Sequence, residues 1–444
     1  MKKNFTSNPP VVIAGAGWAG LAAACKLTSC GYPVRLLEAA PTLGGRARSI
    51  QVNNKQLDNG QHIFLGAYKN MLELLDILGI PETDLFYRMP LDLKIKASLS
   101  TLHIRATRLP SPFHMLGALL TSQGLNWTEK LAISHCWFKI QLSGFRLEKD
   151  IPVLEFLKTH KQSDYIIKIF WEPLCVGALN TNIDQASMQI FLNVLKKSFT
   201  RSNRHSNILL AKKCLGETLP GLVAEFIRQN NGQVSTRERL LSINVKDGLL
   251  QSINTSKGEY DTERLILATP FEQTQKLLGP LPQQATVVSG LQQFSHEPIV
   301  TLYLQYPDNV SIEGNMLGFT DSLTQWLVDR KVCGQPGLIA AVVSANGKHM
   351  SMDKNTLVQT IISEINSHLP DWPKPLDSYL VREKHATFSC HYKINHLRPK
   401  NGNIGQNIWL AGDYTHTGLP ATIEGAVMSG LDCALELIQT SAQD

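Results

Sequence analysis

The 444-residue chain lacks a long apolar run, a C-x-x-C pair, a low-complexity tract and an internal repeat. No stretch reaches the roughly 20 apolar residues that a membrane-spanning helix needs, so at most a peripheral contact with a membrane is expected. The eight cysteines are scattered, which is typical of reduced thiols in a cytoplasmic protein rather than of a disulfide framework. Around Cys390, His391 and His396 no full ligand set exists, so no metal is predicted.

The chain also has no large excess of positive or negative charge. The formal net charge of +6 suits phosphate-bearing ligands or acidic surfaces, but it is far below the basic footprint of a nucleic-acid-binding protein. No zinc-finger, homeodomain or RNA-binding motif accompanies it, so nucleic acid is not an expected partner. The length allows two or three domains with a large core.

What is present begins with a strand–helix–strand pattern. The apolar run 11–14 predicts a buried parallel strand, residues 17–27 fit a helix packed on a sheet, and residues 34–38 form the next strand. Between the first two lies Gly15-Ala16-Gly17-Trp18-Ala19-Gly20, which has the spacing G-x-G-x-x-G. The first glycine permits a tight turn, the second lets backbone approach a pyrophosphate, and the third lets helix and strand pack closely.

Polar residues beyond this motif extend the predicted dinucleotide site. Glu38 ends the second strand, where a carboxylate accepts hydrogen bonds from a ribose diol and disfavours a 2′-phosphate. Gly44-Gly45-Arg46 supplies further donors to a diphosphate. Asn59-Gly60-Gln61-His62 follows at a turn and is expected to line the cofactor pocket.

The rest of the chain changes character several times. Residues 91–104 alternate and predict an antiparallel strand with one wet face, whereas residues 110–200 indicate mainly helices. Segments 233–245 and 249–256 alternate again; 264–270 and 407–413 predict buried strands, and 421–437 predicts an amphipathic helix. Because the Rossmann-like character returns in separated blocks, we expect domains that are interleaved in sequence.

Two of these blocks resemble a known superfamily. The segments "VVIAGAGWAGLAAACKL", "VRLLEAAPTLGGRARS" and "IWLAGDYTHTGLPATIEGAVMSG" are similar to the FAD-binding blocks of the amine oxidase and phytoene desaturase flavoproteins. The pieces "LDNGQHIFLGAY", "WEPLCVGALNT", "EPIVTLYL" and "QWLVDR" resemble one subfamily, the squalene-associated FAD-dependent desaturases identified as hydroxysqualene dehydroxylases. The resemblance spans residues 11–430 and implies FAD as the cofactor.

The resemblance also implies a fold and its domains. We expect an α/β protein in which a Rossmann-like FAD-binding domain of the GR2 type is interleaved with an α+β substrate domain. The FAD-binding domain is predicted over 1–85, 206–285 and 395–444, and the substrate-binding domain over 86–205 and 286–394. One departure is "LGETLPGLVAEFI", where relatives tend to have a glycine-rich helix start. The role of that segment is therefore open.

Carried over position by position, the resemblance assigns a set of cofactor contacts. They are Gly15, Gly17, Trp18, Ala19, Gly20, Glu38, Gly44, Gly45, Arg46, Asn59, Gly60, Gln61, His62, Leu240, Gly412, Asp413, Ala421, Thr422 and Ile423. The glycines of the two glycine motifs, Glu38 and Arg46 hold the ADP half, and the backbone of Leu240 meets adenine. Gly412 and Asp413 meet the diphosphate and ribityl chain, and residues 421–423 lie at the flavin ring.

The implied reaction is reductive removal of the hydroxyl of hydroxysqualene to give squalene. An allylic C–O bond ionises more easily when a proton donor lies beside the leaving hydroxyl. The candidate donors are His62, Glu172, Asp329 and Tyr414. The expected partners are an apolar isoprenoid substrate and upstream squalene-pathway enzymes. With one complete dinucleotide fingerprint, the sequence identifies no motif for a nicotinamide electron donor.

Such a substrate dissolves in membranes, which suggests a cytoplasmic protein with peripheral contact to the inner membrane. Residues 109–147 combine apolar clusters with aromatic and basic residues, as interfacial helices do, although an ordinary domain surface has a similar composition. The residues of this pattern are Trp127, Lys130, Trp137, Phe138, Lys139 and Arg146.

Two other classes of function use the same architecture. The first is oxidation, by a carotenoid-type desaturase or an amine oxidase. The second is isoprenoid binding without catalysis, as in relatives of Rab GDP-dissociation inhibitors, which do not need an intact flavin site. Glu38, the Gly44-Gly45-Arg46 run and the Gly412-Asp413 pair occur together here, which favours an enzyme.

Overall fold

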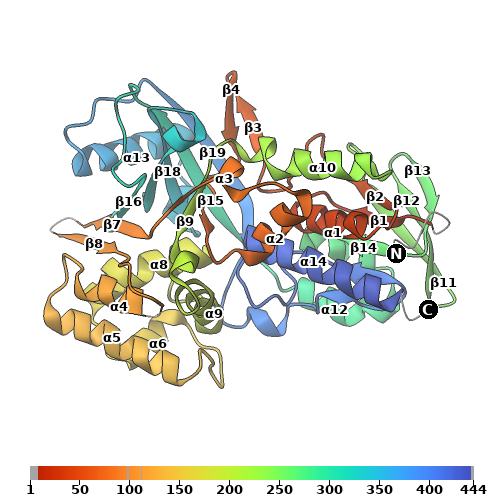
Figure 1. Ribbon diagram of the computed structural model, residues 1–444, viewed down its shortest axis with the longest axis horizontal. Helices are drawn as coiled ribbons and strands as arrows, with labels where there is room; N and C mark the ends of the chain where they lie inside the picture. The colour runs from red at the N-terminus through yellow and green to blue at the C-terminus, as the bar shows by residue number, and fades with distance from the viewer. Residues whose placement is uncertain (1–8, 98–99, 112, 442–444) are drawn as a thin grey trace.

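The computed structural model describes residues 9–97, 100–111 and 113–441 and shows an α/β protein with two large sheets (Figure 1). The six-stranded sheet consists of β10 (Gln233–Ser235), β2 (Val34–Leu37), β1 (Val11–Ala14), β14 (Leu265–Leu267), β21 (Ile408–Leu410) and β20 (Gly402–Asn403), in that order. Its first five strands run parallel and β20 is antiparallel to β21. The chain therefore brings its first and last strands into one sheet.

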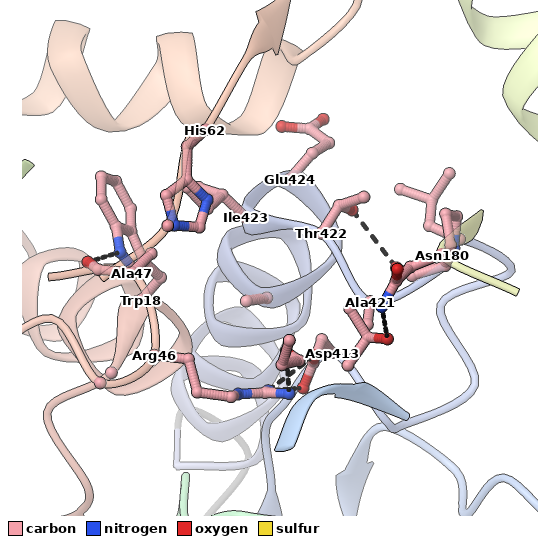
Figure 2. A pocket seen from close by; sticks show the side chains of 18 of the residues that line it. Trp18, Arg46, Ala47, His62, Asn180, Asp413, Ala421, Thr422, Ile423 and Glu424 are labelled. Atoms are coloured by element: carbon pink, nitrogen blue, oxygen red, sulfur yellow. Dashed lines mark hydrogen bonds and ion pairs between the residues drawn. The ribbon is translucent and has the colours of Figure 1, made fainter. Parts of the chain in front are cut away.

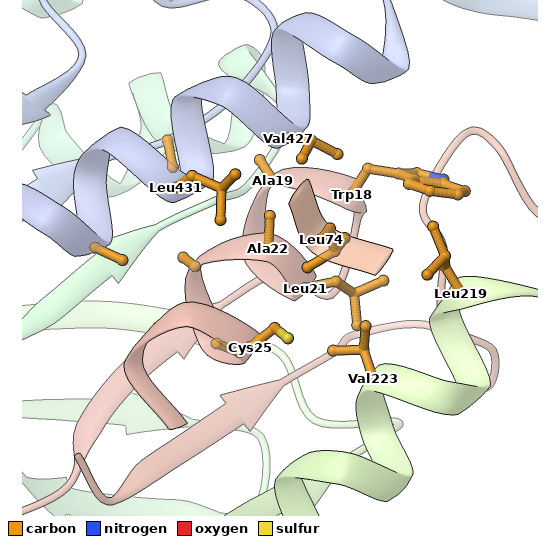
Figure 3. Close-up of a cluster of buried hydrophobic side chains, with 14 of the residues drawn as sticks. Trp18, Ala19, Leu21, Ala22, Cys25, Leu74, Leu219, Val223, Val427 and Leu431 are labelled. Atoms are coloured by element: carbon orange, nitrogen blue, oxygen red, sulfur yellow. The ribbon is translucent and has the colours of Figure 1, made fainter. Parts of the chain in front are cut away.

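Helices cover one face of this sheet. They are α1 (Trp18–Ser29), α2 (Lys69–Leu78), α10 (Leu219–Gln229) and α14 (Ile423–Thr440). Figure 3 shows Ala19 and Ala22 of α1 beside Val427 and Leu431 of α14, while Val223 of α10 contributes from another side. Small side chains on α1 let the neighbouring helices approach closely, which explains why nearly every residue of α1 is buried.

A three-stranded sheet packs on the opposite face. It contains β11 (Leu240–Lys246), β12 (Leu249–Thr255) and β13 (Gly258–Asp261), and α11 (Phe271–Leu278) and α12 (Ala285–Leu291) lie nearby. The prediction of one alternating segment over 233–245 was wrong, because β10 joins the parallel sheet and β11 begins the antiparallel one. Between the two strands, Arg237 has a φ of +54°, which interrupts the extended backbone.

The second large sheet has seven strands in a mixed arrangement. Their order is β19 (Asp377–Phe388), β15 (His296–Gln305), β18 (Leu338–Ser344), β17 (Trp326–Asp329), β16 (Met316–Phe319), β7 (Asp92–Lys96) and β8 (Thr101–Arg105). The hairpin β7–β8 is antiparallel, as the alternation over 91–104 predicted. One face packs on α13 (Lys354–His368) through Val300 and Leu302, whereas the neighbouring Ile299 faces the opposite side and a large cavity.

The predicted helical region is confirmed and forms a lobe below this sheet in Figure 1. It contains α4 (Phe113–Leu120), α5 (Trp127–Leu142), α6 (Val153–Thr159), α7 (Asp164–Ile166), a π-helical turn (Ile167–Trp171), α8 (Glu172–Leu179) and α9 (Met188–Phe199). Asn126 and Glu129 form a reciprocal capping box at the start of α5. None of the helices in the described part of the chain combines the length and apolar character of a bilayer-spanning segment.

Short strands connect the two halves. A hairpin joins β3 (Ser49–Val52) to β4 (Lys55–Asp58), and a small sheet joins β5 (Phe64–Leu65), β9 (Ile208–Ala211) and β6 (Phe86–Met89), with α3 (Glu82–Leu85) just before β6. The predicted boundaries at 86 and 206 put β6 in the substrate domain and β9 in the FAD-binding domain, yet these two strands pair with each other. The domain boundaries therefore stay a prediction.

Candidate cofactor and substrate site

A cavity of about 800 Å³ lies between the two large sheets and is lined by both ends of the chain. Every residue that the sequence assigned to the cofactor lines this cavity except Gly20. A Cβ atom on Gly20 would lie 1.9 Å from the backbone oxygen of Gly15, so Gly20 serves close packing, as the motif predicts for its third glycine. The individual contacts with FAD stay predictions.

Glycines shape the polar end of the cavity. Gly15 has a φ of +103°, and a Cβ there would lie 2.4 Å from the oxygen of Ala268. A Cβ on Gly45, whose φ is +61°, would lie 3.1 Å from the Cα of Gly17. Two loops therefore meet through glycines and present backbone to the cavity. Such a cradle at a helix N-terminus suits a pyrophosphate.

Glu38 is fixed beside this cradle. One carboxylate oxygen accepts a hydrogen bond from the Ala16 amide and the other from the Ala40 amide, both at 2.8 Å. The carboxylate therefore sits at the end of β2 and faces the glycine loop, where a ribose diol of the cofactor fits.

An ion pair joins the two terminal blocks. Arg46 Nη2 lies 2.7 Å from both carboxylate oxygens of Asp413, as Figure 2 shows. The Trp18 indole donates to the Ala47 oxygen at 3.0 Å and ties the start of α1 to the same loop. Residues nearly 370 positions apart in the sequence thus form one wall of the cavity, as a shared FAD site requires.

Arg398 supports this wall and was not anticipated from the sequence. It donates to the backbone oxygens of Asp413, Thr415 and Leu419 at 2.8 Å each. Burial lowers the pKa of Arg398 to about 10, yet this leaves it protonated at neutral pH. The segment "HLRPKNG" carries no local signal for this role, because the contacts arise only when β21 and the following loop fold around the side chain.

The far end of the cavity is apolar. The apolar lining residues on or next to the seven-stranded sheet, α8 and α9 include Leu91, Leu93, Leu174, Phe191, Val194, Leu195, Phe199, Ile299, Met316, Trp326, Val328 and Val342. Asn180, Tyr68 and Lys197 are polar residues on the lining. The sequence contained these apolar residues but did not separate cavity walls from core.

Two of the four candidate proton donors line the cavity. His62 is half-buried above Ile423 in Figure 2. Burial lowers its pKa, Asp58 opposes this effect and Arg330 adds to it, so the imidazole is neutral at neutral pH. Tyr414 is 2 % exposed and its hydroxyl bonds that of Thr274 at 2.9 Å. Burial raises the pKa of Tyr414, which therefore keeps its proton.

The other two candidates do not line the cavity, which argues against a catalytic role. The Asp329 carboxylate accepts from the backbone amides of Ile312 and Lys331, both at 2.9 Å, and so starts a 3₁₀-helix. Glu172 is half-buried at the start of α8, while the next residues, Pro173 and Leu174, reach the cavity. Burial raises the pKa of Glu172.

Glu424 is a cavity residue that the sequence prediction omitted. It is 2 % exposed and accepts hydrogen bonds from the amides of Asn70 and Met71, both at 3.1 Å, and from the Asn70 side chain at 2.7 Å. Thr422 caps the same helix by accepting from the Gly425 amide. The spacing "ATIEG" predicts a helix start, but only the fold shows that Glu424 joins α14 to α2.

One group of possible metal ligands occurs among the described residues: Glu272, His296 and His385, whose ligand atoms lie within 4.8 Å of one another. The two imidazole rings stack 4.1 Å apart at 11°. Because nearly parallel rings direct their lone pairs side by side rather than at one point, we interpret this group as a polar cluster in which His296 is hydrogen-bonded to Glu272 and His385 stacks on His296.

Comparison with known proteins agrees with this geometry. A family model described as flavin containing amine oxidoreductase matches residues 18–438. The 15-cis-phytoene desaturase of Solanum lycopersicum is 24% identical over 97% of this chain and 77% of its own length. The hydroxysqualene dehydroxylases of Sinorhizobium fredii and Zymomonas mobilis are 23% and 22% identical, over 95% of this chain and 96% and 97% of their own lengths.

Solved structures share the fold. A putrescine oxidase variant superposes with a TM-score of 0.73 at 16% identity, covering 98% of this chain and 99% of its own. The cyclohexylamine oxidase of Brevibacterium oxydans gives 0.70 at 14% identity, covering 98% of this chain and 100% of its own. The expected resemblance and the expected cofactor, FAD, are confirmed. The chain is an FAD-dependent oxidoreductase and belongs to the family of flavin containing amine oxidoreductases.

Proposed function

We propose that this oxidoreductase removes the hydroxyl of hydroxysqualene reductively and releases squalene and water. The observation that carries the proposal is the two-part cavity, with a glycine cradle at one end and a long apolar wall at the other. An isoprenoid chain buries its hydrocarbon against such a wall, whereas a cationic amine gains little there. When bound and reduced, FAD supplies hydride transfer.

The residues around the cavity have three tasks. The apolar side chains hold the isoprenoid and exclude water, which protects an allylic cation from hydrolysis. His62 is neutral in this setting and donates an N–H hydrogen bond to the leaving hydroxyl. Asn180 is held by the Ala345 amide and the Thr387 hydroxyl, at 2.6 and 2.9 Å, and orients the substrate near residues 421–423.

The share of each relative's length that this chain matches supports the same reaction. The two hydroxysqualene dehydroxylases are matched over 96% and 97% of their own lengths, whereas the phytoene desaturases are matched over 77–82%. Oxidative desaturation of a polyene is the second candidate, because the phytoene desaturases are similar across 97–99% of this chain.

A substrate panel tests the proposal. FAD-loaded protein is reduced anaerobically with dithionite and mixed with hydroxysqualene, and oxidised protein is mixed with phytoene or with amines. Extraction and mass analysis should find squalene in the first reaction and unchanged compounds in the others. Unchanged hydroxysqualene together with desaturated phytoene would contradict the reductive proposal in favour of the oxidative one.

We also propose that α4 and α5 contact an anionic membrane surface, from which the substrate enters after upstream squalene-pathway enzymes release it. Large apolar side chains are exposed on these helices, at 39–67 %: Phe113, Leu116, Leu120, Trp127, Leu131, Phe138 and Leu142. Lys139 and Arg146 are exposed beside them.

Two residues of the predicted pattern do not belong to this surface. Lys130 is buried and donates to the backbone oxygens of Leu120 and Ser122. Trp137 is also partly buried and packs on Phe145.

Co-sedimentation with anionic vesicles at low salt tests this contact. The triple variant Trp127→Ser, Leu131→Ser, Phe138→Ser should lose most of the binding. Leu376→Ser is the control, since Leu376 is 71 % exposed just before β19, away from α4 and α5. Equal binding of the two variants, or no binding by the native chain, argues against a membrane-facing surface.

A further inference from the structure

Two cysteines from distant parts of the chain meet at one buried arginine. Cys214 precedes the 3₁₀-helix Leu215–Glu217, and Cys333 ends the 3₁₀-helix Arg330–Cys333. Arg330 Nη2 lies 3.3 Å from the Cys214 sulfur and 3.2 Å from the Cys333 sulfur. Both sulfurs therefore contact the same guanidinium nitrogen, and the Cys214 thiol donates a hydrogen bond to the backbone oxygen of Gln56 at 3.6 Å. Both are free cysteines, so nothing covalent joins them.

The surroundings favour a thiolate at Cys333. The Arg330 side chain is 3 % exposed, and a buried guanidinium beside a thiol stabilises its ionised form. The neighbouring Cys214 thiol lowers the pKa of Cys333; burial opposes this shift and Arg330 reinforces it. The closeness of Cys333 and burial raise the pKa of Cys214, which therefore keeps its proton.

Access to solvent differs between the two sulfurs. Cys333 is half-buried and Cys214 is buried, with 6 % of its surface exposed. A small oxidant therefore reaches Cys333 first, and a second thiol stands beside it. A reactive thiolate next to a resolving thiol is the arrangement of redox-sensitive cysteine pairs.

We propose that Cys214 and Cys333 form a peroxide-reactive dithiol that closes to a reversible disulfide. The Cys333 thiolate attacks one oxygen of hydrogen peroxide, giving a sulfenic acid and hydroxide, which takes up a proton as water. The Cys214 sulfur then attacks the Cys333 sulfur, and the S–S bond forms as the second water leaves. In total, two thiols lose two electrons and two protons, and one peroxide becomes two waters.

The pair is connected to the cofactor cavity. Arg330 Nη1 lies 3.1 Å from an Asp58 carboxylate oxygen and 3.0 Å from the Gln61 side-chain oxygen, and Gln61 lines the cavity. The other Asp58 oxygen accepts from the Leu215 amide at 2.7 Å. The segment "LGETLPGL", which departs from the related pattern, is therefore anchored to this network. Disulfide closure removes two acceptors from Arg330 and should weaken FAD binding about fivefold.

Mapping the oxidised thiols tests the proposal on the intact, fully reduced chain. The protein is treated with stoichiometric hydrogen peroxide, alkylated and digested, and its peptides are analysed by mass spectrometry. We expect one crosslinked pair that contains Cys214 and Cys333 and that dithiothreitol separates. Cys214→Ser should accumulate a dimedone-reactive sulfenic acid at Cys333, and Cys333→Ser should leave Cys214 reduced.

Cys30→Ser is the matched control, because Cys30 is an exposed cysteine outside the pair; it should leave the crosslink intact. Peroxide that oxidises Cys30 while Cys214 and Cys333 are both recovered as thiols overturns the proposal. This result is read on the native chain, so it does not depend on whether a variant folds. It needs no substrate, so it is independent of the reaction proposed above.

Discussion

The two walls of the cavity are built from opposite materials. The cofactor wall consists of backbone amides, exposed by glycines that carry no side chain, and of a few charged groups such as Glu38 and the Arg46–Asp413 pair. The substrate wall consists of ordinary apolar side chains such as Leu93 and Phe191. A site made of backbone needs fixed residue types at fixed spacing, whereas a site made of packing tolerates many sequences. The two walls should therefore respond differently to substitution.

The largest effect is expected at the glycine contact. Gly45→Val should reduce FAD affinity roughly 100-fold or more, because the side chain strains a positive φ and enters the contact with Gly17. Flavin absorbance after gel filtration measures it. Gly31→Ala is the control, since Gly31 also has a positive φ but meets nothing within 4 Å. If Gly31→Ala loses as much FAD as Gly45→Val, backbone strain rather than the contact between the two glycine loops explains the loss.

The second-largest effect on FAD binding is expected at Glu38. We expect the native chain to purify yellow and Glu38→Ala to bind FAD about 30-fold more weakly, because a charged acceptor contributes about 2 kcal/mol. A fluorescence titration with FAD gives the affinity. Glu383→Ala serves as the comparison, since Glu383 also lines the cavity but lies on β19, outside the fingerprint. A colourless native protein that takes up no FAD would contradict the account of this wall.

His62→Phe tests the boundary between the two walls. It keeps a ring of similar shape but removes the N–H donor, so squalene formation in a single turnover should slow about tenfold. The amount of bound FAD, read from the same samples, separates a catalytic effect from a loss of cofactor. An unchanged rate with full FAD would remove His62 as the hydrogen-bond donor.

Glu424 offers a prediction about pH. Burial raises its pKa above the ordinary value of 4.5, so the folded chain binds this proton more tightly than the unfolded chain. Its contribution to stability is therefore present below pH 4.5 and is lost as the pH rises through the folded-state pKa. Because a glutamine does not titrate, Glu424→Gln should become more stable relative to the native chain as the pH rises from 5 to 8. Urea unfolding of both proteins at the two pH values measures the difference, and a constant difference would contradict it.

The smallest effect is expected on the substrate wall. Leu93→Val removes one methylene from an apolar lining and should change KM for the isoprenoid less than about fivefold, with FAD binding unchanged. Initial rates over a range of substrate concentrations measure it. A loss of FAD from this variant would show that the two walls are not independent.

The same contrast explains what could be predicted from the sequence. The glycine fingerprint, Glu38 and the Gly412-Asp413 strand end follow from local spacing, and the structure places them in one cavity. Asp329 was chosen for a motif but caps a 3₁₀-helix, and Arg398 was missed because its partners lie on a loop that folds around it. Whether a polar side chain faces a cavity or a backbone amide depends on tertiary contacts that residue type and spacing do not encode.

The most direct test of the two-part cavity follows flavin colour and product together. FAD-loaded protein is bleached with dithionite under anaerobic conditions, and hydroxysqualene is added. We expect the yellow colour to return as an equal amount of squalene forms in a single turnover. Protein that stays bleached beside unchanged hydroxysqualene would contradict the account, because hydride would then not pass from the cofactor wall to a substrate held on the apolar wall.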